Sequence, residues 1–208
     1  MNKEPLFETY LLKASANTRA YDIFNVFQRR KDISTYYWNC ASDLHAAALL
    51  LGNAIESNLG IDANTLGLDR GFSLDCALPP PFRLNAALSI ELLLKAIGKI
   101  LDRPEQHHHR LNVLCQHVGV QISDDMAAIL DIFTESIYWS GRYPVPKDLQ
   151  TWENSLNIKS SLYSITTLEE FSIWKPIPER MPNLKNYEKI WSYLNSYYSE
   201  AAENISEP

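Results

Sequence analysis

The chain has 208 residues, of which 46% are hydrophobic, 21% charged and 11% aromatic, with seven Gly and 11 Pro. This composition excludes collagen-like, low-complexity and wholly disordered proteins, and it supplies enough apolar residues for one large domain or for one domain with appendages. The formal net charge of −6 at pH 7 argues against a protein that coats nucleic acid by general phosphate neutralisation, but it leaves room for a local basic site.

Cysteine usage and hydropathy indicate the compartment. The three cysteines, Cys40, Cys76 and Cys115, are widely spaced and form no C-x-x-C motif, so a disulfide framework or a structural zinc site is not expected. Residues 1–13 contain two acids and no apolar stretch of signal-peptide length, and the chain has no run of 18 apolar residues. We therefore expect a cytoplasmic protein with no membrane association.

The first part of the chain is predicted to form two helices and a loop. Apolar residues recur at helical spacing from Asn17 or Thr18 to the basic run at 29–31, and again from Ser34 to about Gly60. Residues 58–82 contain three glycines and three consecutive prolines without a sustained period, which predicts a long loop. We expect that loop to pack over the helices through four apolar side chains: Leu66, Leu68, Phe72 and Leu74.

The strongest helical segment is residues 83–101, which are apolar on nearly all sides of a helical wheel. Such a helix is typical of the centre of a bundle. Pro104 ends it, and a shorter helix is predicted from about His109 to Val118, before Gly119.

Further helices are predicted in the second half. Ser123 is a good N-cap for a helix that continues to Ile137, residues 148–156 favour a short helix, residues 159–166 are ambiguous, and Thr167-x-x-Glu170 has the form of a capping box. A last helix carries apolar residues three and four positions apart: Leu184, Tyr187, Trp191, Leu194, Tyr198 and Ala201. Since no segment shows convincing strand alternation, the sequence predicts an all-α, up-and-down helical bundle.

Glu91 and Lys95 are charged residues within the apolar central helix, four positions apart in the order that favours an ion pair. A buried pair costs more to desolvate than it usually returns, so it needs further partners or a role. It is either a structural pair at an edge of the bundle or part of a functional site. Arg142, in the sequence WSGRYP at 139–144, either belongs to aromatic packing at a helix end or reaches back to a buried acid such as Glu91.

Three consecutive histidines, His107, His108 and His109, lie within the run DRPEQHHHR at 102–110. In a regular helix they would point about 100° apart from one another and could not converge on one metal ion. We therefore expect neither a dedicated metal site nor a cofactor, and a metalloenzyme built on these histidines ranks last among the hypotheses.

Metal-independent RNA cleavage needs a base for the 2′-hydroxyl proton and a cation for the phosphate. Histidine and arginine meet these needs. Arg103 lies five and six positions before His108 and His109, and Arg110 lies seven positions before His117, on the same helix face. These spacings are also common by chance in a chain with five histidines, so plain solvation is the alternative interpretation.

The segment ALSIELLLKAI at 87–97, a polar loop, the sequence His109-Arg-Leu-x-x-Leu and a helix ending in RYP at 142–144 together resemble bacterial HEPN-domain proteins (higher eukaryotes and prokaryotes nucleotide-binding). The resemblance covers about residues 34–146. It implies a helical bundle at 34–146, with helical extensions at 1–33 and at 147–208, the latter packed on the bundle. Glu91, Lys95 and His109 match the family pattern.

Many members of that family are homodimeric, metal-independent endoribonucleases of toxin–antitoxin or phage-defence systems, with Arg, four to six residues and then His in the active site. Arg103 with His108 or His109, and Arg110 with His117, satisfy this spacing. Pro104 and Leu111, which follow the two arginines, depart from the polar residue usual in active members.

The resemblance thus implies an endoribonuclease in which His109 or His117 is the base, Arg103 or Arg110 holds the phosphate, and Glu91 and Lys95 orient these groups. Its implied partners are a second copy of the chain, RNA, and a cognate antitoxin or other partner protein. The alternative is a non-catalytic HEPN-like module that binds a nucleotide or a partner protein, with the aromatic C-terminal helix as a docking face.

Overall fold

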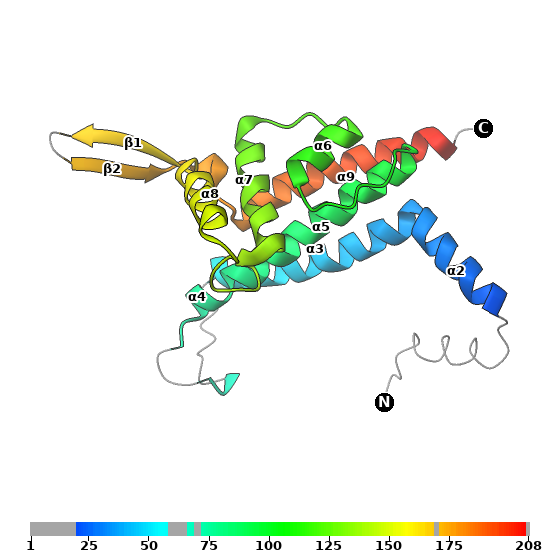
Figure 1. Ribbon diagram of the computed structural model, residues 1–208, viewed down its shortest axis with the longest axis horizontal. Helices are drawn as coiled ribbons and strands as arrows, with labels where there is room; N and C mark the ends of the chain where they lie inside the picture. Colours follow the sequence, from blue (N-terminus) through cyan, green and yellow to red (C-terminus); the bar gives the residue numbers. More distant parts are fainter. Residues whose placement is uncertain (1–19, 58–65, 69–71, 169–170, 207–208) are drawn as a thin grey trace.

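The computed structural model describes residues 20–57, 66–68, 72–168 and 171–206, and over these residues it confirms the predicted all-α class (Figure 1). The elements in chain order are α2 (Ala20–Asp32), α3 (Ser34–Glu56), α4 (Leu74–Ala77), α5 (Pro79–Ile100), α6 (Leu111–Val118), α7 (Asp124–Glu135), the π-helix η2 (Ser136–Ser140), α8 (Leu149–Ser160), β1 (Tyr163–Leu168), β2 (Phe171–Pro176), the 3-10 helix η3 (Pro178–Arg180) and α9 (Leu184–Ser206).

Helix α5 is the centre of the molecule, as its all-round apolar sequence predicts. It packs along α3 and also contacts α9, α6, α7 and η2 (Figure 1). Its buried residues include Ile90, Leu93, Leu94 and Ile97, each with no exposed surface. Full burial of an aliphatic side chain stabilises a fold by about 1.5–3 kcal/mol, so this helix supplies much of the driving force for folding.

Helix α9 confirms the predicted C-terminal helix. All six of its expected apolar positions are buried: Leu184, Tyr187, Trp191, Leu194, Tyr198 and Ala201. The Tyr187 ring meets the rings of Phe82 and Phe133 edge-on, at centroid distances of 5.9 Å and 6.2 Å. Helix α9 therefore shares one core with α3 and α5.

The start of α5 corrects the predicted loop at 58–82. The helix begins at Pro79 rather than at Arg83, because proline fits the first turn of a helix, where its missing N–H has no intrahelical partner to lose. Leu66 and Phe72 are 56% and 47% exposed, so the expectation that they pack over the bundle is wrong. Residues 58–65 and 69–71 lie outside the described residues.

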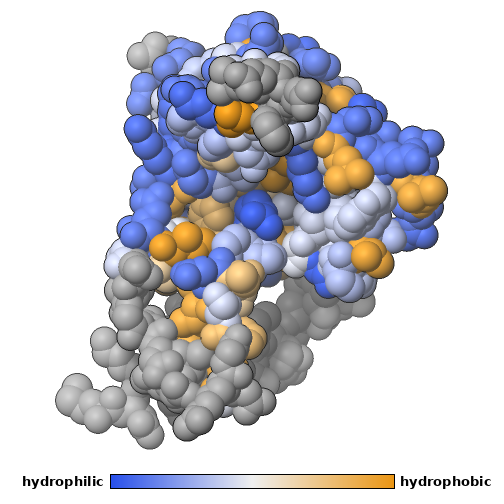
Figure 2. Space-filling model, turned by 90° about the vertical axis from the view of Figure 1, so that its left-hand side faces the viewer, coloured by the Kyte–Doolittle hydropathy of each residue, from blue (hydrophilic) through white to orange (hydrophobic). Residues whose placement is uncertain are grey.

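The β1–β2 hairpin is a second correction, because the capping box at 167–170 predicts a helix. The strands pair antiparallel, with Ile165 opposite Trp174 and Thr166 opposite Ile173. β-branched and aromatic residues favour a pleated strand, and their cross-strand contacts override the local helix signal. The hairpin extends away from the helices (Figure 1), and Figure 2 shows hydrophilic and apolar residues intermixed on this end of the molecule.

Helix ends in the second half follow local capping chemistry. The Ser123 hydroxyl accepts a hydrogen bond from the Met126 N–H, which confirms the predicted cap. Asp148 caps α8 through the Thr151 N–H at 2.8 Å, and α8 continues to Ser160 instead of ending near residue 156. Helix α7 widens at its end into η2, a conformation that is frequent at functional sites.

Along the residues that the structure describes, every helix is too short or too polar to cross a lipid bilayer.

Candidate functional site

A carboxylate–histidine dyad joins α5 to the connection between α5 and α6. Glu91 of α5 is only 4% exposed, and its Oε1 lies 2.6 Å from Lys95 Nζ. The Nδ1 atom of His109 lies 3.0 Å from Oε1 and 2.9 Å from Oε2 of the same carboxylate. The structure therefore brings together Glu91, Lys95 and His109, the three residues that the resemblance to HEPN-domain proteins singles out.

The geometry assigns the protons of His109. A carboxylate only accepts hydrogen bonds, so Nδ1 of His109 carries the proton, and in the neutral ring the lone pair is on Nε2. The His109 side chain is 45% exposed, and its ring packs edge-on against Tyr138 of η2 at a centroid distance of 5.7 Å. A ring fixed in this tautomer, with its basic nitrogen turned away from the carboxylate, is arranged to accept a proton from a bound molecule.

The sequence places the helix start at His109, but α6 begins at Leu111. The residues before it, 103–110, are irregular, because the side chain of His109 turns back to Glu91 while the N–H of Leu111 donates to Thr134 Oγ1 at 3.1 Å. A side-chain hydroxyl of α7 thus satisfies a donor that a longer helix would have used.

His108 and Arg110 flank the dyad. The Arg110 N–H donates to His108 Nδ1 at 3.2 Å, which puts the proton of a neutral His108 on Nε2. Burial, followed by the positive charges of Arg110 and Lys95, holds the pKa of His108 below its ordinary value. Arg110 is exposed, so its guanidinium is open to solvent, and its charge also acts on the Asp131 carboxyl, whose pKa it lowers against the larger effect of burial.

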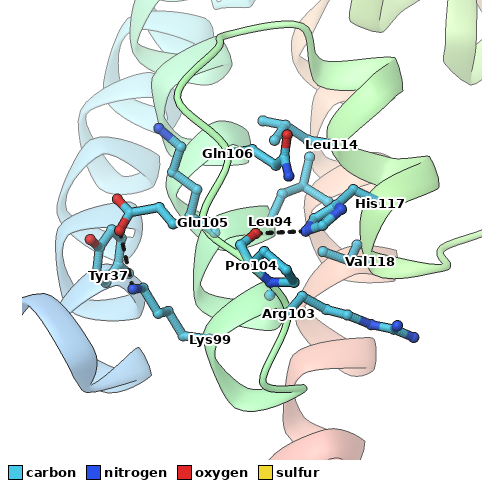
Figure 3. Close-up of a pocket in the computed structure, with 12 residues that line it drawn as sticks. Tyr37, Leu94, Lys99, Arg103, Pro104, Glu105, Gln106, Leu114, His117 and Val118 are labelled. Carbon is cyan, nitrogen blue, oxygen red and sulfur yellow. Dashed lines mark hydrogen bonds and ion pairs between the residues drawn. The ribbon is translucent and has the colours of Figure 1, made fainter.

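Arg103 and His117 lie elsewhere, in the wall of a small cavity of about 20 Å³ beside α5 and α6 (Figure 3). His117 Nε2 donates to the Pro104 carbonyl at 2.9 Å, and the Arg103 side chain extends away from it (Figure 3). The Arg103 N–H donates to the carbonyl of Gly98. Gly98 is seven residues after Glu91 and therefore lies about 10 Å further along α5. The structure thus separates Arg103 from His109.

Arg110 and His117 are also apart, because Arg110 is the N-cap residue of α6 and His117 lies in its last turn, about 10 Å further along the helix.

One interpretation of the sequence has Arg142 reaching back to Glu91, but in the structure its guanidinium binds elsewhere. Its Nη2 donates to the carbonyls of Ile137 and Tyr138, at 2.5 Å and 3.3 Å. The guanidinium therefore satisfies carbonyl groups of the π-helix and acts as a local cap, because these carbonyls have fewer backbone partners where the helix ends.

A groove of about 890 Å³ lies between the α7–η2 segment and α8, and sequence reasoning did not find it. Arg110 and Tyr138 line it, so it adjoins the dyad. Two acids, the half-buried Asp131 and the buried Glu135, also line it, and burial raises the pKa of both carboxyl groups. The one feature of the sequence that could have indicated the groove is Glu135, an acid next to the buried face of a predicted amphipathic helix.

The acids of the groove have hydrogen-bond partners. Ser155 donates to Glu135 Oε2 at 3.0 Å, and Asn112 donates to Asp131 Oδ1 at 2.6 Å. Among the described residues, no group of three or more His, Cys, Asp or Glu side chains is arranged to hold a metal ion, in the groove or at the dyad.

No family model, curated protein or solved structure matches this chain. The fold and the site together define an all-α protein with a buried carboxylate that orients a partly exposed histidine, and the geometry of that site carries the functional proposal.

Proposed function

We propose that this chain is a HEPN-like, metal-independent endoribonuclease of a toxin–antitoxin or phage-defence system, with His109 as its general base. The observation that carries the proposal is the dyad: Glu91 binds Nδ1 of His109 and leaves Nε2 as the basic atom of a 45%-exposed ring. Lys95 pairs with the buried carboxylate of Glu91 at 2.6 Å and offsets part of the cost of desolvating it.

The proposed reaction has one step, in which Nε2 of His109 is the base. Nε2 of His109 takes the proton of an RNA 2′-hydroxyl, and the 2′-oxygen attacks the adjacent phosphorus. The 5′-oxygen leaves with a proton from water, which yields a 2′,3′-cyclic phosphate and a 5′-hydroxyl end. Arg110, adjacent in sequence and exposed, holds the phosphate as charge builds on its oxygens, because a guanidinium binds two phosphate oxygens at once.

The test is incubation of purified protein with single-stranded RNA in EDTA, with cyclic-phosphate ends as the product measured. We expect His109→Ala to lower the cleavage rate by about 10²–10⁴-fold, the usual contribution of a general base. His107→Ala is the matched control, because His107 is exposed in the same histidine run and lies outside the dyad. Absence of cleavage by the wild type, or equal loss in the two variants, would overturn the proposal.

The second candidate is a non-catalytic HEPN-like module that binds a nucleotide. The groove favours it, because its volume of about 890 Å³ is within the usual range for small-ligand sites, about 300–1,000 Å³. Binding of nucleotides by a wild-type protein that leaves RNA intact would support this candidate over the first.

A further inference from the structure

We infer that the groove between α7–η2 and α8 binds one unstacked base of single-stranded RNA, next to the phosphate held at His109. This inference rests on the proposed function, since it assigns a substrate contact to the same site. It goes further because it makes the enzyme selective for unpaired RNA and assigns the part of the protein that reads the base.

Continuity with the dyad is the first argument. Tyr138 packs against the His109 ring on one side and lines the groove on the other. Arg110 also belongs to both places, since it is next to His109 in the sequence and lines the groove. A strand whose phosphate lies at Arg110 therefore has a neighbouring nucleotide at the mouth of the groove.

Flat aromatic surface is the second argument. Tyr138 and Tyr143 line the groove and are 47% and 59% exposed, so their rings are accessible to a ligand. Proteins that bind single-stranded nucleic acid stack bases on exposed aromatic rings of this kind.

An unused donor in the wall is the third argument. Trp139 lines the groove and is 8% exposed, and its Nε1 has no hydrogen-bond acceptor in the part of the chain that the structure describes. Lys159 lies over the faces of Trp139 and Trp152, at 5.4 Å and 5.8 Å from the ring centroids, and so supports the ring from its face and not at its N–H. Because this donor is buried in the wall and not open to the groove, a base carbonyl would satisfy it only with a shift of the wall, and a buried donor without an acceptor is costly enough to favour such a shift.

Charge is the fourth argument. Arg110 and Lys147 line the groove and supply positive charge for the phosphates on either side of the base, while the charge of Arg110 also acts on Asp131, one of the two acids in the groove wall. Asn154 and Thr151 of α8 offer further donors and acceptors for the edge of the base. A base-paired duplex does not offer a free base to such a groove, because its bases are stacked and their pairing edges are occupied.

Binding is tested without cleavage by using an RNA analogue that lacks the 2′-hydroxyl nucleophile, a labelled single-stranded 2′-O-methyl oligonucleotide of mixed sequence. We expect Tyr143→Ala to weaken its binding by about tenfold, as loss of one stacking contact does. The matched control is Tyr163→Ala, a half-exposed tyrosine of the hairpin outside the groove, and we expect it to bind as the wild type does. The same oligonucleotide annealed to its complement should bind at least tenfold more weakly than the single strand.

A second measurement reports the groove directly. In the wild-type protein with ¹⁵N-labelled tryptophan, the indole N–H signal of Trp139, assigned with Trp139→Phe, should shift on addition of the single strand, while that of exposed Trp174 should not. Equal binding by Tyr143→Ala and the wild type, equal binding of the duplex, or an unmoved Trp139 signal would each overturn the inference.

The two proposals fail separately. Binding that depends on Tyr143 in a protein that leaves RNA intact overturns the endoribonuclease and keeps the base-binding groove. Cleavage that depends on His109, with binding indifferent to Tyr143, keeps the endoribonuclease and overturns the groove.

Discussion

His109 Nδ1 lies within 3.0 Å of both carboxylate oxygens of Glu91, a residue 18 positions earlier in the chain. This contact ties the irregular connection at 103–110 to the central helix, and it accounts for two features at once. It gives the buried Glu91–Lys95 pair the third partner that a buried charge needs. It also holds the ring of His109 in one tautomer, with the proton on Nδ1 and the lone pair on Nε2.

Replacing Glu91 by Gln tests the role of the dyad in orienting His109. The amide is similar in size to the carboxylate, but it carries no charge, and its –NH₂ group competes for the position facing Nδ1. We expect RNA cleavage to fall by about 10²–10⁴-fold, as in serine proteases when the acid behind the histidine becomes an amide. Circular dichroism should show an unchanged helix content, which separates this effect from unfolding.

The control for that prediction is Glu105→Gln, because Glu105 pairs with Lys99 at 3.3 Å in the same connection but does not touch His109. A comparable loss of cleavage in the two variants would contradict a specific role for Glu91. A shift in the ¹⁵N resonances of the His109 ring that appears only in Glu91→Gln would support it.

Sequence reasoning was most successful where the signal is local. The all-round apolar pattern of α5 predicts its central burial, and the charged pair within that pattern marks Glu91 as unusual. The histidine that completes the dyad was one candidate among several, because His108, His109 and His117 all satisfy the same Arg-to-His spacings. The backbone path of residues 103–110 decides among them, and that path has no periodicity to predict it.

Non-local contacts account for what the sequence did not predict. The pairing of Ile165 with Trp174 makes a hairpin where Thr167-x-x-Glu170 has the form of a helix start. Likewise the groove exists only because the chain after η2 turns back and lays α8 against α7. Neither contact leaves a pattern in the residues of one segment.

Two glycines in the core differ in the space around them, and we expect opposite effects of alanine. A Cβ at Gly52 in α3 would lie 2.7 Å from Leu184 Cδ1 and 3.1 Å from Phe82 Cε2, so Gly52→Ala should destabilise the protein by about 1–3 kcal/mol, as overpacking does. At Gly98 in α5 the nearest atom is Val118 Cγ1 at 3.5 Å, an ordinary contact, so Gly98→Ala should stabilise it by up to about 1 kcal/mol. Urea unfolding measures both, and effects of the same sign would contradict this packing.

His45 is expected to make stability depend on pH below neutrality. Its ring stacks on Trp191 at 4.1 Å and its Nδ1 lies 2.7 Å from the Tyr187 hydroxyl, and burial lowers its pKa from 6.5. His45 therefore binds a proton more readily in the unfolded chain than in the folded chain. The contribution of neutral His45 to stability is fully present above about pH 6.5 and is lost as the pH falls towards the lowered pKa of the folded state.

The measurement for His45 is the free energy of unfolding at pH 7.5 and pH 5.5, in the wild type and in His45→Phe. Phenylalanine keeps the stack on Trp191 and does not titrate, while Tyr187 keeps its bond to Ser89 at 2.8 Å. The wild type should lose more stability than the variant over this interval. Parallel losses would show that another group is responsible.

Glu135 should produce the opposite slope. Burial raises its pKa from 4.5, and the hydrogen bond from Ser155 and the charge of Lys159 only partly offset that effect, while Asp131 adds to it. The folded chain therefore holds the proton more tightly than the unfolded chain, so the contribution of Glu135 to stability is greatest below pH 4.5 and falls as the pH rises through the raised pKa. Glu135→Gln removes this titration and keeps an acceptor for Ser155, so the melting temperature of the variant minus that of the wild type should be larger at pH 8 than at pH 4.

Glu153→Gln, at an exposed position of α8, serves as the control, because a hydrated carboxylate costs the fold little. A difference for Glu135→Gln that is independent of pH, or one matched by Glu153→Gln, would mean that the Glu135 carboxyl lies in water and not in the wall of the groove.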